Sequence, residues 1–333
     1  MSNTNLISII EIGDTMKKTK LKVRKQVWIV LATFILIIIL VNVFNNIHKN
    51  NLYKKTNEYR LMQVGYTKEE IKVLEQNTNQ QFIDTLFDNH KNENIISLIQ
   101  NEYYIKDNLN RYIDFLNKNN TSAQEVIASV NTNNDYNYYE HNLDTDTSLD
   151  CLMLVNKYYH LSENYEPNDL VNINNKYYYG TGHKVRKPAY EAFIDLWNAA
   201  NQEGIYLIIN SSYRDYASQS SVYDSFKNQK GTTYADSIAA RPGYSEHQTG
   251  LAIDIFSKEN TTSNNFKGST AHIWLQNNAY KYGFIERYQE GKEKITGFEA
   301  ESWHWRYVGV ETATYIYNHN ITFDEYYAYF IAK

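Results

Sequence analysis

Two short stretches of this sequence carry side chains suited to metal chemistry. The first holds His247 and, seven residues later, Asp254. The second holds His304, with Glu301 three residues before it. Two imidazoles and one carboxylate supply the three protein ligands of a catalytic zinc site, which keeps a fourth position for water. Glu301 is then a candidate general base, and the chemistry that this set predicts is zinc-assisted hydrolysis.

A positive charge near such a site would serve amide hydrolysis. Arg214 follows residues 205–209, a short apolar run that predicts a strand. Loops after strands often carry functional residues, and a guanidinium pairs with a carboxylate through two parallel hydrogen bonds. We therefore expect Arg214 to bind the C-terminal carboxylate of a peptide or the developing oxyanion.

Residue types and spacing alone leave other readings open. A single histidine is more often structural than a metal ligand, and this interpretation is applied to His141, His160, His183 and His272. An aspartate inside a strand is less ordinary, because a buried carboxylate without a partner is costly. Even so, the pattern by itself does not exclude structural roles for all of these side chains.

Alternating apolar and polar residues predict the strands that must position the candidate ligands. Residues 251–256 alternate so that Asp254 faces away from the apolar positions. Residues 303–308 form a second predicted strand, which contains His304. On an ideal strand Glu301 and His304 face opposite sides, because their separation is odd. We therefore predict a bend just before this strand, at Glu301 and the residue that follows it.

Helices are predicted between these strands. Pro188 suits a first helical turn and Gly204 a helix end. Further helices are expected over residues 215–227 and 273–282. Strands and helices mix without regular β-α-β alternation, which favours a compact α+β domain over residues 150–333.

The N-terminal region contains one long apolar segment. Residues 27–44 carry no charge and span about 27 Å as a helix, close to a hydrocarbon core of about 30 Å. Residues 17–25 hold basic side chains and no acid, which places residues 1–26 in the cytoplasm. A cleaved signal peptide is the alternative. The length of the apolar run and the absence of a small-x-small cleavage pattern favour an uncleaved transmembrane helix.

Residues 45–149 are predicted to be an extracellular, mostly helical spacer, with capping boxes that begin at Thr67 and Ser122. A wall-binding module is the alternative. The chain has 333 residues, a net charge of −5 and one cysteine. This charge gives no sign of a nucleic-acid partner, and a single cysteine excludes an intramolecular disulfide.

Several short motifs occur in this sequence in the same order as in a known protein family. The pattern SxHxxGxAxD at residues 245–254, followed by ExWH at residues 301–304, resembles the zinc D-alanyl-D-alanine carboxypeptidases of the VanY type. The likeness covers roughly residues 150–333. It implies a compact α+β domain with a small antiparallel sheet flanked by helices. It also implies that His247, Asp254 and His304 bind Zn²⁺ and that Glu301 is the catalytic base.

The same resemblance extends to the substrate site. Ser212, Tyr213 and Arg214, followed by Gln219, are similar to the family's substrate-binding segment. It implies that Arg214 stabilises the substrate or the transition state, with Gln219 and Ser245 as lesser contacts. The family usually has proline at the position of Ser302. This departure loosens the predicted bend but removes no chemical group.

The resulting hypothesis is a membrane-anchored zinc carboxypeptidase that removes the terminal D-Ala of peptidoglycan stem peptides outside the cell. A D,D-dipeptidase or a peptidoglycan endopeptidase of the same fold is the alternative within the enzyme class. A non-catalytic cell-wall-binding protein is the alternative outside it. Such a protein is expected to have lost a ligand or the base, and all four positions are filled here.

Overall fold

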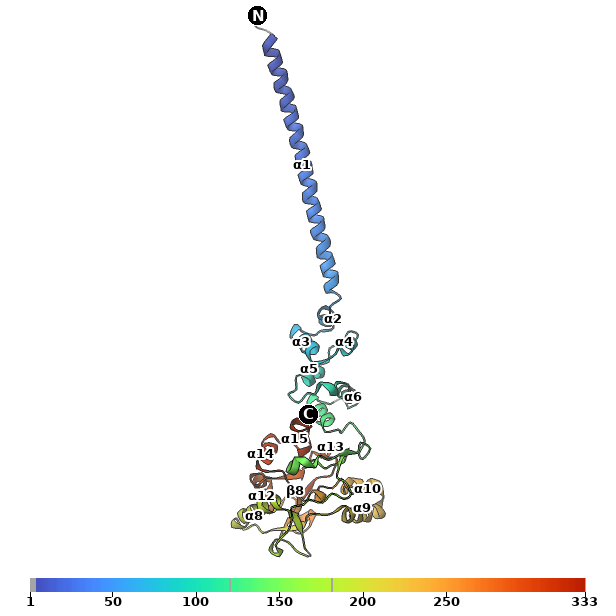
Figure 1. The fold of residues 1–333 in the computed structure, drawn as a ribbon, viewed down its shortest axis with the longest axis vertical. Helices are drawn as coiled ribbons and strands as arrows, with labels where there is room; N and C mark the ends of the chain where they lie inside the picture. The colour runs from blue at the N-terminus through green and yellow to red at the C-terminus, as the bar shows by residue number, and fades with distance from the viewer. Residues whose placement is uncertain (1–3, 120, 181, 333) are drawn as a thin grey trace. The chain divides into compact units, whose positions relative to one another are not determined.

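The computed structural model describes residues 4–119, 121–180 and 182–332, without the side chains of residues 4–23 (Figure 1). The chain divides into two compact units, Met1–Ile96 and Ser97–Lys333. Residues 97–149, which the sequence pattern assigned to the spacer, therefore belong to the same unit as the predicted catalytic segment. A functional boundary at residue 150 stays a prediction.

The first unit begins with a long helix, α1 (Thr4–Tyr53). Its part from Arg24 to Tyr53 is long and apolar enough to cross a membrane, and an 18-residue window within it has a mean hydropathy of 2.9. A signal sequence has the same character, so anchoring and orientation stay predictions. Residues 1–3 of the predicted tail, and the side chains of its lysines before Arg24, lie outside the described part of the chain.

Short helices follow in the first unit. They are α2 (Asn57–Val64), α3 (Lys68–Asn77), α4 (Gln80–Leu86) and α5 (Glu93–Ile99), the last of which crosses into the second unit. The capping box predicted for α3 is confirmed. Thr67 accepts a hydrogen bond from the Glu70 backbone N–H, and the Glu70 carboxylate accepts one from the Thr67 N–H at 2.8 Å.

A four-stranded antiparallel sheet organises the second unit. Its order is β5 (Leu207–Ser211), β6 (Ala252–Ser257), β8 (Glu301–Tyr307) and β7 (Phe284–Tyr288). Two small ladders accompany it: β1 (Leu143–Asp144) with β2 (Tyr159–His160), and β3 (Leu170–Asn172) with β4 (Lys184–Arg186). The register between β6 and β8 pairs Asp254 with His304. The predicted α+β class with a small antiparallel sheet is confirmed.

Helices surround this sheet. In Figure 1, α8 (Lys187–Gln202) and α12 (Thr270–Asn278) are drawn at one flank of the unit, and α9 (Tyr216–Lys230) and α10 (Thr232–Ile238) at the other. The remaining helices are α6 (Leu109–Asn119), α7 (Ala123–Asn131), α11 (Ser263–Phe266), α13 (Glu293–Thr296), α14 (Val310–His319) and α15 (Phe323–Phe330). Single 3₁₀ turns are η1 (Lys106–Asn108), η2 (Thr147–Leu152), η3 (Asn175–Tyr177), η4 (Glu246–Thr249) and η5 (Ala279–Tyr282).

The main core lies between the sheet and α8. Phe193 and Leu196 of α8 pack there with Ile253 and Ile255 of β6, as the apolar periodicities predict. Every residue of β6 is buried, including Asp254. This strand is therefore covered on both faces, and a carboxylate inside it needs a specific partner.

Residues 97–149 contribute to the interior of the second unit. Val126 and Ile127 of α7 are almost fully buried, and α7 contacts α13 and α15. The ring of Tyr103 stacks on that of Tyr329 with centroids 3.9 Å apart. The Asn134 side chain donates a hydrogen bond to the Ile295 carbonyl at 2.8 Å. These contacts tie the segment to the C-terminal helices.

The bend predicted before residue 303 is wrong, because β8 already begins at Glu301. The register with β7 shifts instead: Glu286 pairs with Trp305, whereas Tyr288 pairs with Glu301. Between these two pairs the chain advances four residues on β8 but only two on β7. This irregularity has the effect of a β-bulge, which breaks the strict alternation of side chains. Residues three apart on β8 can therefore share a face.

Candidate active site

Three side chains that lie far apart in the sequence converge beside β6. The ligand atoms of His247, Asp254 and His304 all lie within 4.8 Å of one another, and all three residues are buried. Asp254 Oδ1 lies 3.5 Å from His247 Nε2 and 3.2 Å from His304 Nδ1. Within the described part of the chain, this buried oxygen has no hydrogen-bond partner. An orphaned carboxylate oxygen between two imidazole nitrogens fits a divalent cation.

A glycine permits the short path from His247 to Asp254. Gly250 ends η4 with φ of +68°, a left-handed conformation. A Cβ atom at this position would lie 2.9 Å from side-chain atoms of Leu170 and Arg186. A larger residue would therefore be strained by the left-handed backbone and would have to displace these side chains of β3 and β4.

In each imidazole, one ring nitrogen faces the candidate metal site and the other lies near an oxygen that can accept a hydrogen bond. His247 Nδ1 lies 2.8 Å from the carbonyl oxygen of Ser212, which leaves Nε2 toward Asp254. His304 Nε2 lies 3.3 Å from Glu246 Oε2, which leaves Nδ1 toward Asp254. Hydrogen bonds of this kind orient metal-binding histidines. Sequence reasoning missed Glu246, because its position beside His247 does not reveal its contact with His304.

Glu301 lies beside this cluster, as its proposed role requires. Its Oε2 is 3.7 Å from His304 Nδ1, and its side chain remains 20% exposed. Burial raises the pKa of Glu301 to about 7, with the His304 charge opposing the shift and the Asp254 charge adding to it. A carboxyl group with a pKa near neutrality can both accept and return a proton.

The irregularity in β8 explains how Glu301 reaches this face. Glu301 and His304 are three residues apart and meet at the cluster. Ser302 and Trp305, also three residues apart, both line a separate cavity. The two pairs thus occupy different sides of one strand.

Arg214 is a half-buried cation with neutral partners. It donates hydrogen bonds to Gln219 Oε1 at 2.8 Å and to Ser211 Oγ at 2.9 Å. Burial lowers the pKa of Arg214, while the charges of Asp254 and Glu301 oppose this shift. These contacts fix the guanidinium without neutralising it, so its charge remains available for an anion.

The two residues predicted as lesser substrate contacts, Gln219 and Ser245, are both buried. Gln219 donates to the Ala240 carbonyl at 2.7 Å while it accepts from Arg214. It therefore holds Arg214 in place, and direct contact with substrate stays a prediction. Ser245 is 4% exposed and immediately precedes η4. Its predicted contact with substrate also stays a prediction.

His183, interpreted from the sequence as structural, lies close to this site. Its Nδ1 is 2.9 Å from the hydroxyl of Ser212, the residue whose carbonyl faces His247. Burial lowers the pKa of His183, which favours a neutral ring that supports the Ser212 loop.

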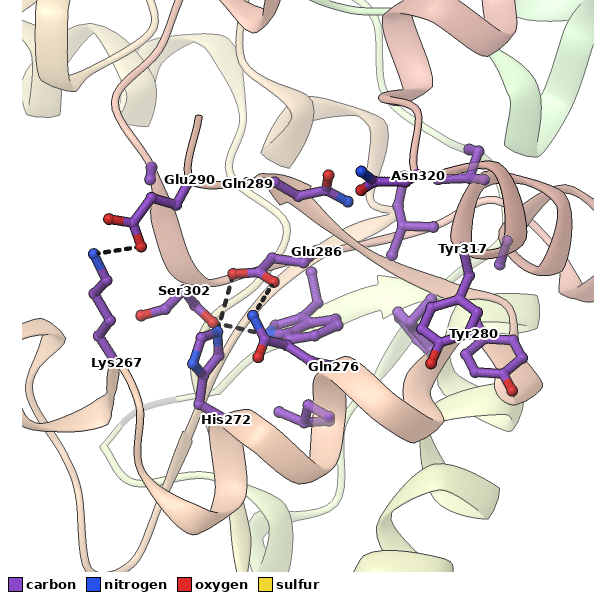
Figure 2. Close-up of a pocket in the computed structure, with 17 residues that line it drawn as sticks. Lys267, His272, Gln276, Tyr280, Glu286, Gln289, Glu290, Ser302, Tyr317 and Asn320 are labelled. Atoms are coloured by element: carbon purple, nitrogen blue, oxygen red, sulfur yellow. Dashed lines mark hydrogen bonds and ion pairs between the residues drawn. The ribbon is translucent and has the colours of Figure 1, made fainter. Parts of the chain in front are cut away.

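A separate cavity of about 310 Å³ lies between β7, β8 and α12 (Figure 2). His272 Nε2 and Gln276 Nε2 each lie 2.9 Å from a carboxylate oxygen of Glu286 in its wall. Among the described residues, those predicted for the active site do not line this cavity. His272, also interpreted as structural, is thus held in a hydrogen-bonded cluster away from the candidate metal ligands.

Comparison with known proteins identifies the family. Residues 182–310 match the family model described as VanY, D-alanyl-D-alanine carboxypeptidase. The putative carboxypeptidase YodJ of Bacillus subtilis (strain 168) is 40% identical over 222 residues, which cover 63% of this chain and 79% of that protein. The chain belongs to the VanY family of D-alanyl-D-alanine carboxypeptidases. It is therefore an enzyme, a peptidase, as the motifs predicted.

Two further proteins are similar to this chain. The bifunctional D-Ala-D-Ala dipeptidase and D-Ala-D-Ala carboxypeptidase VanXYC of Enterococcus gallinarum is 32% identical, over 54% of this chain and 95% of that protein. The solved LD-carboxypeptidase LdcB is 40% identical, with a TM-score of 0.53 over 56% of this chain and 89% of that chain. The VanY match includes every residue predicted for the site.

Proposed function

We propose that this protein is a membrane-anchored zinc D-alanyl-D-alanine carboxypeptidase that removes the terminal D-Ala of peptidoglycan stem peptides. The observation that carries the proposal is the convergence of His247, Asp254 and His304 with Glu301 at their edge. Arg214 supplies a positive charge to the same site. Membership of the VanY family provides the reaction class.

The donor set fits zinc. His247 Nε2, Asp254 Oδ1 and His304 Nδ1 would hold the ion, with two nitrogens and one oxygen as in many catalytic zinc sites. When bound, zinc lowers the pKa of water and polarises the scissile carbonyl. Because all three of these side chains are buried, few solvent molecules can reach the ion and compete with the substrate for it.

The chain's own residues handle the protons and the charge. Glu301 accepts a proton from the attacking water and returns it to the amine of the departing D-Ala, so that one C–N bond breaks and one C–O bond forms. Its pKa of about 7 allows both transfers near neutral pH. Arg214 pairs with the substrate carboxylate or with the oxyanion that develops during attack.

The proposed cellular location would bring the enzyme to its proposed substrate. Peptidoglycan lies outside the cytoplasmic membrane, and α1 contains a segment long and apolar enough to cross it. The basic residues before this segment favour a cytoplasmic N-terminus. This orientation places the catalytic unit outside the cell, next to its substrate.

A direct assay tests the proposed reaction. Full-length protein in detergent is incubated with a stem pentapeptide, with and without a zinc chelator, and released D-Ala is measured. We expect release that stops on chelation and returns when zinc is added back. Release that continues in the fully metal-free protein would contradict the zinc mechanism.

A second candidate is an L,D-carboxypeptidase, and the likeness to LdcB favours it. Such an enzyme removes D-Ala from a tetrapeptide, where the preceding residue has the L configuration. Parallel assays with pentapeptide, tetrapeptide and free D-Ala-D-Ala separate the possibilities. A carboxypeptidase for D-Ala-D-Ala ends prefers the pentapeptide, whereas turnover of the free dipeptide indicates a D,D-dipeptidase.

The affinity for zinc is expected to rise with pH. Burial lowers the pKa of His304 in the metal-free protein, but the neighbouring carboxylates of Asp254 and Glu246 outweigh it and raise the pKa to about 9. Below this pH the ring must lose one proton before it can bind metal. The apparent affinity should therefore increase about tenfold per pH unit up to about pH 9.

Competition with a chromophoric chelator at several pH values measures this dependence, after correction for the chelator's own protonation. Calorimetry in buffers of different ionisation enthalpy provides a check, because one proton should leave His304 for each zinc bound. Affinity that stays constant from about pH 7 to about pH 8.5 would show that no such proton is released.

A further inference from the structure

We propose that Glu246 is a positioning residue that fixes the tautomer of His304. By accepting a hydrogen bond from Nε2–H, it keeps the single proton of the neutral ring away from Nδ1, the nitrogen that faces the other proposed metal ligands. This inference rests on the proposed zinc site. It adds a function for a residue that belongs to neither the ligands nor the base.

The contacts of Glu246 divide its two oxygens between different partners. Its side chain is fully buried. Oε1 accepts hydrogen bonds from Arg287 Nε at 2.7 Å and from Arg306 Nη1 at 3.0 Å. Oε2 lies 3.3 Å from His304 Nε2. Since a carboxylate can only accept, the imidazole must donate through Nε2.

The surroundings hold Glu246 in this orientation. Arg287 forms a two-pronged pair with Asp324 of α15, at 2.6 and 3.2 Å. Arg306 Nη2 donates to the carbonyls of Cys151 and Met153, at 3.1 and 2.8 Å. The cluster contains two carboxylates and two guanidiniums, so its formal charges balance. A buried, balanced and fully bonded cluster has little freedom to rotate.

The arginines make the Glu246→Gln variant informative. A guanidinium only donates, so the amide oxygen of glutamine must face Arg287 and Arg306. The amide NH₂ then faces His304 Nε2, where it favours an imidazole that accepts at Nε2 and carries its proton on Nδ1. The nitrogen needed by the metal is thereby blocked. The substitution therefore does more than remove a contact, because it favours the wrong tautomer.

A purely structural role would predict a different result. If Glu246 served only to balance the arginines, other members of the cluster would matter equally for zinc. Asp324→Asn is the matched control, because it removes one carboxylate oxygen from the same cluster. Asp324 contacts Arg287 and Asn156 rather than His304.

The test measures zinc affinity in full-length protein, in detergent, by competition with a chromophoric chelator. We expect Glu246→Gln to weaken zinc binding about 100-fold, the upper end for outer-shell partners of metal ligands. Asp324→Asn should bind zinc with unchanged affinity. Equal losses in both variants, or an unchanged affinity in Glu246→Gln, would overturn the assignment. If the wild type binds no zinc, the proposed function itself fails, and the inference fails with it.

A second measurement needs no variant and decides the matter if Glu246→Gln does not fold. Nitrogen-15 NMR of zinc-loaded wild-type protein reports which ring nitrogen of His304 carries hydrogen. We expect a protonated Nε2 and a metal-shifted Nδ1. An unprotonated Nε2 would show that Glu246 does not fix the tautomer.

Discussion

Replacing Glu301 by Gln is expected to lower the rate of D-Ala release about 1000-fold, within the usual range for loss of a general base. The amide keeps the size of the side chain but cannot take up the proton of the attacking water. The three proposed metal ligands remain in place, so zinc affinity should change little. The rate is measured with stoichiometric zinc, and bound metal is determined on the same sample.

His304→Ala provides the contrasting control, because it removes a ligand rather than the base. This variant should lose both metal and activity, whereas Glu301→Gln should lose activity alone. If Glu301→Gln hydrolyses the pentapeptide at the wild-type rate, another group accepts the proton. Glu301 would then have to be removed from the mechanism.

Arg214→Ala is expected to reduce kcat/KM about 100-fold, an effect typical of a lost donor to a developing negative charge. The wild-type guanidinium is half-buried and bonded only to neutral side chains among its described partners. Its charge is therefore strong at short range and is not offset by a direct ion pair. Kinetics with the pentapeptide and a metal determination on the same variant measure the effect.

Two related variants sharpen this test. Arg214→Lys retains the charge but not the planar fork, so its activity should lie between those of the wild type and Arg214→Ala. Gln219→Leu removes one support of the guanidinium and should cause a smaller loss than Arg214→Ala. Wild-type kinetics in Arg214→Ala with metal bound would exclude Arg214 from the site.

The candidate ligands could be predicted from the sequence because few residue types bind zinc and their spacing matched a known pattern. A strand over residues 251–256 could also be predicted from its alternation, and β6 is found there, whereas the small antiparallel sheet was implied only by the family resemblance. The irregularity in β8 could not be predicted, because periodicity assumes that every residue advances the strand equally. It becomes visible only when the partner strand fixes the register.

The outer contacts of the site were beyond sequence reasoning for a different reason. Glu246 touches His304 across 58 positions of sequence, and Arg287 reaches Asp324 across another 37. Charged residues of this kind usually lie on the surface, so nothing local distinguishes a buried ion pair from a solvated one. Likewise, the apolar periodicity of α7 predicts an amphipathic helix, but it does not reveal which other helices pack against its apolar face.

The contacts of residues 97–149 with the C-terminal helices bear on how the protein responds to proteases. Cleavage near residue 149 would detach Val126 and Ile127 from their packing, at a cost of about 1.5–3 kcal/mol for each side chain. A domain is stable by only about 5–15 kcal/mol. Trimming at that point should therefore inactivate the peptidase rather than release a working catalytic fragment.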